Sequence, residues 1–122
     1  MAERIPPHNE EAERSVLGAV MLNKDVLSEV LEEVSADDFY NESHREIFKA
    51  IWELYKNNTA VDMLTVCEEL KKRKALEMAG GRAYIATLTA EVPSTVNAVE
   101  YAKIVAEKAI LRQMIKTLED SL

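Results

Sequence analysis

The stretch NAVEYAKIVAEKAILRQMIKTLEDSL, residues 97–122, carries the strongest structural signal in the chain. No Gly or Pro interrupts it and Asn97 suits a helix N-cap, so we predict one long helix that runs to the end. On a helical wheel, small residues gather on one side: Val99, Ala102, Val105, Ala106 and Ala109. Side chains of this size favour close packing against the core of the chain itself.

The opposite side of this helix carries larger apolar residues: Tyr101, Ile104, Leu111, Ile115, Leu118 and Leu122. With Lys108 included, they alternate in steps of 3 and 4 residues, which is typical of a coiled-coil seam. A helix that is apolar on two opposite faces needs two partners, here the core and either a missing segment or another chain. Burial of the whole helix in a larger bundle is the alternative. A small chain has little core left to surround the far end, which favours the external partner.

Capping residues divide the rest of the chain into shorter helices. The predicted starts are Asn9, then Asn23 or Asp25, then Asn41, Asp62 and the Gly80-Gly81 pair, with a capped single turn over residues 35–38. No segment alternates apolar and polar residues as a strand would. We therefore predict an all-α fold: a compact orthogonal bundle of about six helices over residues 1–96, followed by a long C-terminal helix over residues 97–122.

Helical spacing also assigns residues to the core. Trp52 and Phe48 are expected inside the bundle, as are Leu64 and Cys67 on the fourth main helix. Gly18 lies within the first helix, where glycine costs about 1 kcal/mol relative to alanine. We expect this cost to be offset by the close approach of a neighbouring helix.

Length and composition exclude several classes of protein. The chain has 122 residues, 48% hydrophobic and 30% charged, which is typical of one globular domain. A net charge of -7 makes nucleic acid an unfavourable main ligand. One cysteine, no secretory signal and no apolar run of membrane length indicate a cytoplasmic protein without membrane contact. We expect Met1 to be a native start and the helical ending to continue in a longer chain.

Catalytic, cofactor and metal motifs are not found in the sequence. Neither G-x-x-x-x-G-K-[ST] nor G-x-G-x-x-G occurs, and His8 and His44 lack the spacing of a metal site. His44 is interpreted as a hydrogen-bonded structural histidine and Cys67 as an inert core thiol. The basic run over residues 71–74 follows from the attraction of cations to a helix C-terminus. We predict no catalytic, cofactor-binding or metal-binding residue in this chain.

Five segments, in order along the chain, resemble the N-terminal domain of the bacterial DnaB-type replicative DNA helicases. The first is RIPPHNEEAERSVLG over residues 4–18, and the second is residues 38–40 followed by His44-Arg45 and Ile47-Phe48. The others are Val61-Asp62 with Thr65, then residues 80–85, then residues 92–94 with Asn97 and the runs 101–105 and 107–112. Ser35 and Ala60 depart from the family, which often has proline at these positions.

The resemblance implies a role in assembly rather than catalysis for this chain. The family's parent protein is a hexameric ring that unwinds DNA using ATP and Mg²⁺ in a RecA-like motor domain, which is absent here. The N-terminal domains form a collar by head contacts and by pairing of helical hairpins, of which residues 97–122 would be the first arm. The collar docks primase and shapes contacts with helicase loaders, while DNA is bound mainly by the motor domain.

The sequence and the resemblance together predict a set of partner-binding residues: Tyr84, Tyr101, Ile104, Leu111, Ile115 and Leu118. Aromatic and aliphatic anchors of this kind dominate interface energies. The first alternative is a free-standing helical adaptor or regulator of replication without a motor. A ligand-binding or enzymatic bundle is the second, and it would require a polar pocket with shifted pKa values.

Overall fold

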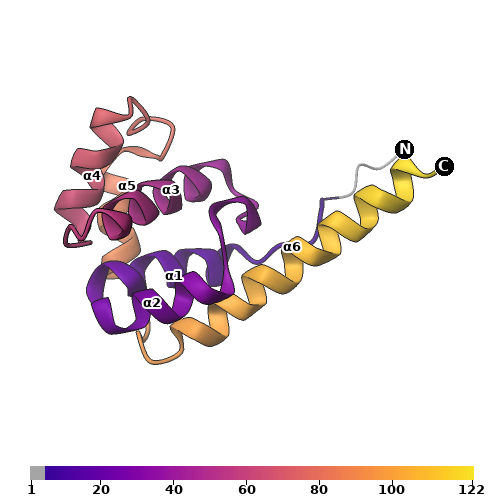
Figure 1. Ribbon diagram of the computed structural model, residues 1–122, viewed down its shortest axis with the longest axis horizontal. Helices are drawn as coiled ribbons and strands as arrows, with labels where there is room; N and C mark the ends of the chain where they lie inside the picture. The colour runs from indigo at the N-terminus through magenta and orange to yellow at the C-terminus, as the bar shows by residue number, and fades with distance from the viewer. Residues whose placement is uncertain (1–4) are drawn as a thin grey trace.

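The structure, a computed structural model, describes residues 5–122 and contains only helices there (Figure 1). Met1 and Arg4, named above as a native start and as part of the first resembling segment, lie outside the described residues. The helices are α1 (Glu10–Leu22), α2 (Lys24–Glu33), the 3₁₀ turn η1 (Ala36–Asp38), α3 (Glu42–Lys56), α4 (Met63–Lys72), α5 (Gly81–Ala90) and α6 (Ala98–Asp120). The predicted all-α head with a long C-terminal helix is confirmed.

Most helices begin at the predicted caps. The side chains of Asn9, Asn41 and Asp62 accept hydrogen bonds of 2.8 to 2.9 Å from backbone N–H groups in the first turn of their helices. Asn23 accepts from the Asp25 N–H at 2.9 Å, so Asn23 is the cap of α2. These bonds satisfy donors that the start of a helix leaves without intrahelical partners. Asn97 occupies the N-cap position of α6, but its side chain makes no capping bond.

Helix α1 forms the centre of the head, because α2, α3, α5 and α6 all pack against it. Its residues from Ala12 to Met21 are buried with the exception of the half-buried Arg14. A helix surrounded by four others buries nearly its whole circumference, and the burial of Leu17 beside Val16 reflects this position.

Gly18 allows α1 and α5 to approach each other closely. A Cβ atom built at Gly18 would overlap the Leu88 carbonyl oxygen, and it would lie 3.2 Å from the Cβ atom of Val92. Only a residue without a side chain leaves room for this backbone. The expected compensation for glycine inside a helix is confirmed.

Two residues assigned to the core from helical spacing are exposed, and those predictions were wrong. Trp52 on α3 is 45% exposed and stacks on Tyr55, which is 41% exposed, with ring centroids 6.1 Å apart. Leu64 on α4 is 57% exposed. Both lie at the edge of the head, where α3 and α4 pack mainly on each other and no further helix covers their outer sides.

Helix α6 changes its role along its length. Its first half packs against α1 and α2, with Ala98, Ala102 and Val105 buried in the core of the head. From Gln113 onward every residue is exposed, and this half projects away from the head as a free arm (Figure 1). The division into residues 1–96 and 97–122 stays a prediction, although half of the second segment completes the core of the first.

Candidate interaction surface

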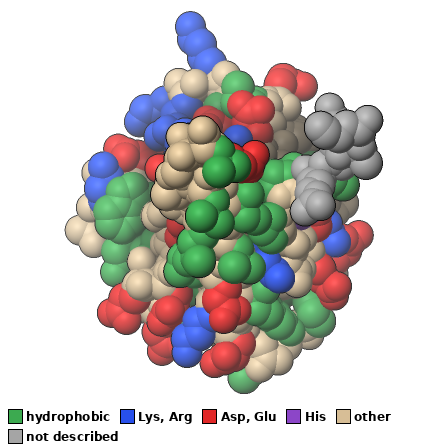
Figure 2. Space-filling model, turned by 90° about the vertical axis from the view of Figure 1, so that its right-hand side faces the viewer, with side chains coloured by type: hydrophobic (Ala, Val, Ile, Leu, Met, Phe, Trp, Pro, Cys, Tyr) green, Lys and Arg blue, Asp and Glu red, His purple; other side chains and the backbone are tan. Residues whose placement is uncertain are grey.

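From Ile110 to the end of the chain, α6 and the two residues after it carry a contiguous set of exposed apolar side chains, which we call the α6 apolar face. Its members are Ile110, Leu111, Met114, Ile115, Leu118 and Leu122, with exposed fractions from 42% to 107%. Figure 2 views the molecule from the side of this arm and shows hydrophobic side chains gathered near the middle of the view. Apolar surface of this extent on a projecting helix is typical of a protein-binding site.

The predicted seam divides into two parts in the structure. Leu111, Ile115 and Leu118 belong to the α6 apolar face, whereas Tyr101 and Ile104 are partly buried against the core of the head. The start of the seam is therefore covered by the head, and only the part from Leu111 onward is exposed to a partner. Whether these residues contact a partner stays a prediction.

Two members of the face, Ile110 and Met114, were missed by the analysis of the seam. Their exposed fractions are 60% and 55%. On the wheel Met114 lies about 90° and Ile110 about 130° from the centre of the seam, outside the strict spacing of 3 and 4. A broader apolar stripe would have included them, and this width suits packing against more than one helix.

Tyr84, the predicted contact on α5, is half-buried and belongs to a buried polar network with His44 and Glu13. His44 is fully buried, and its two ring nitrogens lie 2.7 Å from Glu13 Oε1 and 2.6 Å from the Tyr84 hydroxyl. The expected structural role of His44 is confirmed. The Tyr84 hydroxyl is thus bonded inside the head, and only the outer part of its ring is open to a partner.

Glu13 acts as the acceptor at the centre of this network. Besides His44, it accepts from the backbone N–H groups of Tyr40 at 2.8 Å and Asn41 at 3.3 Å. Burial alone would raise the pKa of Glu13, but these hydrogen bonds outweigh it and leave the pKa below its usual value. The carboxylate is therefore ionised at neutral pH, and His44 Nδ1–H donates to it. His44 Nε2 then accepts from the Tyr84 hydroxyl when the imidazole is neutral.

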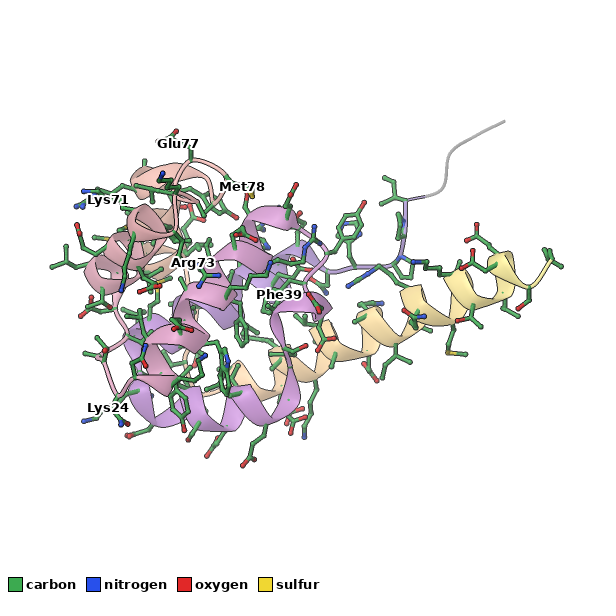
Figure 3. The ribbon with its side chains drawn as sticks, turned by 45° about the horizontal axis from the view of Figure 1, so that its top comes forward. Lys24, Phe39, Lys71, Arg73, Glu77 and Met78 are labelled. Atoms are coloured by element: carbon green, nitrogen blue, oxygen red, sulfur yellow. The ribbon has the colours of Figure 1, made fainter. Side chains whose placement is uncertain are left out.

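A cleft of about 410 Å³ lies between the end of α2, η1 and α3. Its wall includes Phe48, the exposed Trp52 and Arg73. The side chain of Arg73 is labelled in Figure 3. Of the groups whose pKa values are shifted, Glu53 lines this cleft, and hydrogen bonding to Lys56 at the surface lowers its pKa, whereas Glu13, Cys67 and Tyr84 do not line it. Among residues 5–122, no three His, Cys, Asp or Glu side chains are placed to hold a metal ion.

Cys67 is fully buried on α4, and burial raises the pKa of its thiol. Because the thiolate is the reactive form, native protein should react with a thiol reagent far more slowly than unfolded protein does. The measurement is the rate of colour release from an aromatic disulfide with and without denaturant. A native rate equal to the denatured rate would contradict burial of Cys67.

Arg112 makes long-range contacts that the sequence analysis did not find. Its guanidinium donates to the carbonyl oxygens of Pro7 at 2.8 Å and Asp38 at 2.6 Å, and it lies 5.5 Å from the centre of the Tyr40 ring. The partners are separated from Arg112 by 105 and 74 residues in the sequence. No local motif signals such a contact.

The fold and this surface define a class: an all-α domain with a helical arm whose apolar face is left uncovered by the head. The family described as "DnaB-like helicase N terminal domain" matches residues 5–107. The chain belongs to this family. The resemblance inferred from the five sequence segments is thereby confirmed. In the part of the chain that the structure describes, no helix has the length and hydropathy needed to cross a membrane.

Individual relatives agree with this assignment. The chain is 46% identical over 114 residues to the replicative DNA helicase DnaB of Leifsonia xyli subsp. xyli, and 45% identical over 113 residues to that of Treponema pallidum. These matches cover 93% of this chain but 25% and 26% of the relatives. The chain thus spans about a quarter of the length of the curated relatives it matches.

Solved structures show the same fold. The crystal structure of the N-terminal domain of DnaB helicase from Mycobacterium tuberculosis is 43% identical, with a TM-score of 0.89 over 92% of this chain and 80% of that chain. A DnaB-like replicative helicase, whose structure was determined together with its interactions with primase, has a TM-score of 0.81. That match covers 92% of this chain and 26% of the other, and at 24% identity it shows the fold alone.

Proposed function

We propose that this chain is the N-terminal interaction domain of a replicative DNA helicase that unwinds DNA at the replication fork. Family membership and relatives named replicative DNA helicases support the proposal. In the whole protein, a RecA-like motor domain outside this chain would bind ATP and Mg²⁺ and contact most of the DNA. The site of action is the cytoplasm.

The single observation that carries the proposal is the α6 apolar face. Its aliphatic side chains extend beyond the head, where no residue of residues 5–122 covers them. Burial of apolar area contributes roughly 25 cal/mol per Å², so pairing of this face with another helix is favourable. We propose that its partner is the arm of a second subunit, which leads to dimers and to the hexameric collar of the parent protein.

Docking of primase and contact with a helicase loader are the proposed further roles of this domain. The neighbouring DnaB-like helicase is described with its interactions with primase, which supports primase as a partner class. Tyr84 offers a ring whose position is fixed by the His44 bond, and such pre-ordered aromatic side chains are favourable contact points. Absence of binding between this chain and its cognate primase would remove the docking role and leave the assembly role intact.

Mass in solution tests the assembly role. Light scattering after size exclusion, over a range of protein concentrations, should show a dimer or a larger species at micromolar concentration. A strict monomer at the highest concentration would contradict self-association of this chain through the α6 apolar face.

Ile115→Asp is expected to weaken self-association at least about tenfold, because a carboxylate in an apolar interface loses its hydration without gaining a partner. Ile115 is 44% exposed on the free half of α6, so the helical content and the thermal melt should stay unchanged. Leu64→Asp is the matched control, since Leu64 is an exposed aliphatic residue on α4. Equal effects of both substitutions would show that Ile115 has no special role.

A further inference from the structure

Arg112 marks the point at which α6 leaves the head. It is the last residue of the helix that is not exposed, because residues 113–122 are all exposed. Its two guanidinium nitrogens bind two separate segments, Pro7 through Nη1 and Asp38 through Nη2. A planar guanidinium with several donors can hold two carbonyl oxygens at once, which an ammonium group cannot do with the same geometry.

The N-terminal segment is ordered around this contact. The His8 ring stacks on Tyr40 with centroids 4.2 Å apart, and His8 Nδ1–H donates to the Pro6 carbonyl at 2.8 Å. Arg112 lies over the same Tyr40 ring at 5.5 Å. We call the five residues Pro7, His8, Asp38, Tyr40 and Arg112 the Arg112 clasp. It joins the segment Pro7-His8, the turn η1 with the following Tyr40, and α6 in one cluster.

Because Arg112 lies where α6 leaves the head, a small change in helix direction there displaces the end of the helix. Eight residues of α6 follow Arg112, since the helix ends at Asp120, and at 1.5 Å of rise per residue they extend about 12 Å. A change of about 10° in the direction of the helix at Arg112 would move its tip by about 2 Å. Displacements of this size are enough to prevent interdigitation of side chains between two packed helices.

We propose that the Arg112 clasp fixes the direction in which α6 presents its apolar face to a partner. Arg112 is a positioning residue here: it lies outside the α6 apolar face and acts through the angle of the helix. By this route the N-terminal segment around Pro7 and His8 influences assembly without touching the partner. The consequence for assembly rests on the proposed function, whereas the effect on the direction of the arm does not.

The experiment measures the distance between the head and the arm directly. Spin labels are attached in the variants Lys24→Cys and Asp120→Cys combined, both at exposed positions, while the native Cys67 is buried and unreactive. Pulsed electron resonance on dilute protein then gives the distribution of label distances. Arg112→Met, which keeps the apolar stem and removes the guanidinium, is compared with Arg82→Met, a change at an exposed arginine of α5.

We expect Arg112→Met to shift or broaden the distribution by about 2 Å, the tip displacement above, with unchanged helical content. Arg82→Met should leave the distribution as narrow as that of the unsubstituted chain. Equal distributions for Arg112→Met and the unsubstituted chain would overturn the inference, whatever Ile115→Asp does to association.

Association separates the two proposals further. Arg112→Met should weaken self-association about tenfold, because the α6 apolar face would no longer point toward its partner. If the distribution broadens and association is unchanged, the clasp orients the arm but has no role in assembly, which overturns that part of the inference. If Ile115→Asp leaves association unchanged, the proposed function fails while the effect of Arg112 on the arm still stands.

Discussion

Glu13→Ala is expected to lower the free energy of unfolding by about 3 to 5 kcal/mol, because each buried donor left without its acceptor costs about 1 to 3 kcal/mol. Three donors lose their acceptor at once: His44 Nδ1–H and the backbone N–H groups of Tyr40 and Asn41. The His44 N–H cannot turn to water, because the Glu13 and His44 side chains are 2% and 0% exposed, while the bonds from Tyr40 and Asn41 are partly buried. A domain of this size has about 5 to 15 kcal/mol of stability, so the loss is a large fraction of it.

Urea unfolding followed by circular dichroism measures this loss. Glu11→Ala is the matched control, since Glu11 lies on the same helix in the same sequence context but is exposed, and a change within about 0.5 kcal/mol is expected there. A similar cost for Glu11→Ala and Glu13→Ala would mean that the network adds nothing to stability.

Glu13→Gln should cost less, about 1 to 2 kcal/mol. The amide oxygen can still accept from Tyr40, and the amide nitrogen would face His44 Nδ1. The imidazole can adapt by moving its proton to Nε2, which then donates to the Tyr84 hydroxyl. Only the Asn41 N–H then lacks an acceptor, which leaves a smaller penalty than in Glu13→Ala.

The pH dependence of stability follows from the same carboxylate. Because the folded protein lowers the pKa of Glu13 below its usual value, the unfolded chain binds the proton more readily. Its contribution is therefore fully present above that value and is lost as the pH falls through the lower folded pKa. Unfolding free energies measured from neutral to acidic pH should fall less steeply in Glu13→Gln than in the unsubstituted chain.

Gly18→Ala is expected to destabilise the head by about 2 kcal/mol or more, although alanine is the better helix former by about 1 kcal/mol. The added methyl group would overlap the Leu88 carbonyl oxygen, which is backbone and cannot rotate away. Helices α1 and α5 would have to separate, and contacts around the buried Ile85 and Val16 would be lost.

The direction in which Gly18→Ala changes the free energy of unfolding distinguishes close packing of α1 and α5 from helix propensity. If helix propensity alone governed this position, the variant would be more stable than the parent. Gly81→Ala is the comparison: its Cβ would meet no atom within 4 Å, but its φ of 82° is strained for alanine. A cost of about 1 kcal/mol from the backbone is expected there. Stabilisation by Gly18→Ala would show that α1 and α5 are not in close contact.

The sequence predicted those features of the fold that depend on neighbouring residues. Helix starts at Asn9, Asn41 and Asp62 were found because a cap bonds to the backbone only two or three residues away. The close approach at Gly18 was also anticipated, because glycine inside a helix has a cost that packing must offset. The partner element, α5, could not be named from this argument.

The wrong assignments to the core concern how far burial extends along a helix, and not which face of the helix is turned toward the core. A wheel gives the apolar face of α3 and α4 correctly, yet it does not tell where along the helix the covering elements end. Trp52 and Leu64 therefore share the spacing of core residues and are still exposed at the edge of the head. The seam on α6 shows the same effect, since Ile104 is covered and Leu118 is exposed.

Contacts between distant segments were beyond the reach of spacing arguments. The Tyr84 hydroxyl bonds to His44, 40 residues earlier, and Arg112 bonds to Pro7, 105 residues earlier. Each chain segment looks ordinary by itself, and only the fold brings the donors to their acceptors. The candidate site was therefore predicted where it is a property of one helix, and missed where it joins several.

Because α6 is one uninterrupted helix, its buried half and its exposed half are locked in rotational phase. A single residue inserted just after Arg112 would turn everything beyond it by about 100°, and it would aim the α6 apolar face at a different neighbour while the head stayed intact. An insertion of seven residues, close to two turns, would nearly restore the direction in which the face points and would place it farther from the head. The geometry of any assembly built from this arm is thus encoded in the count of residues between Val105 and Ile115 as much as in their identities.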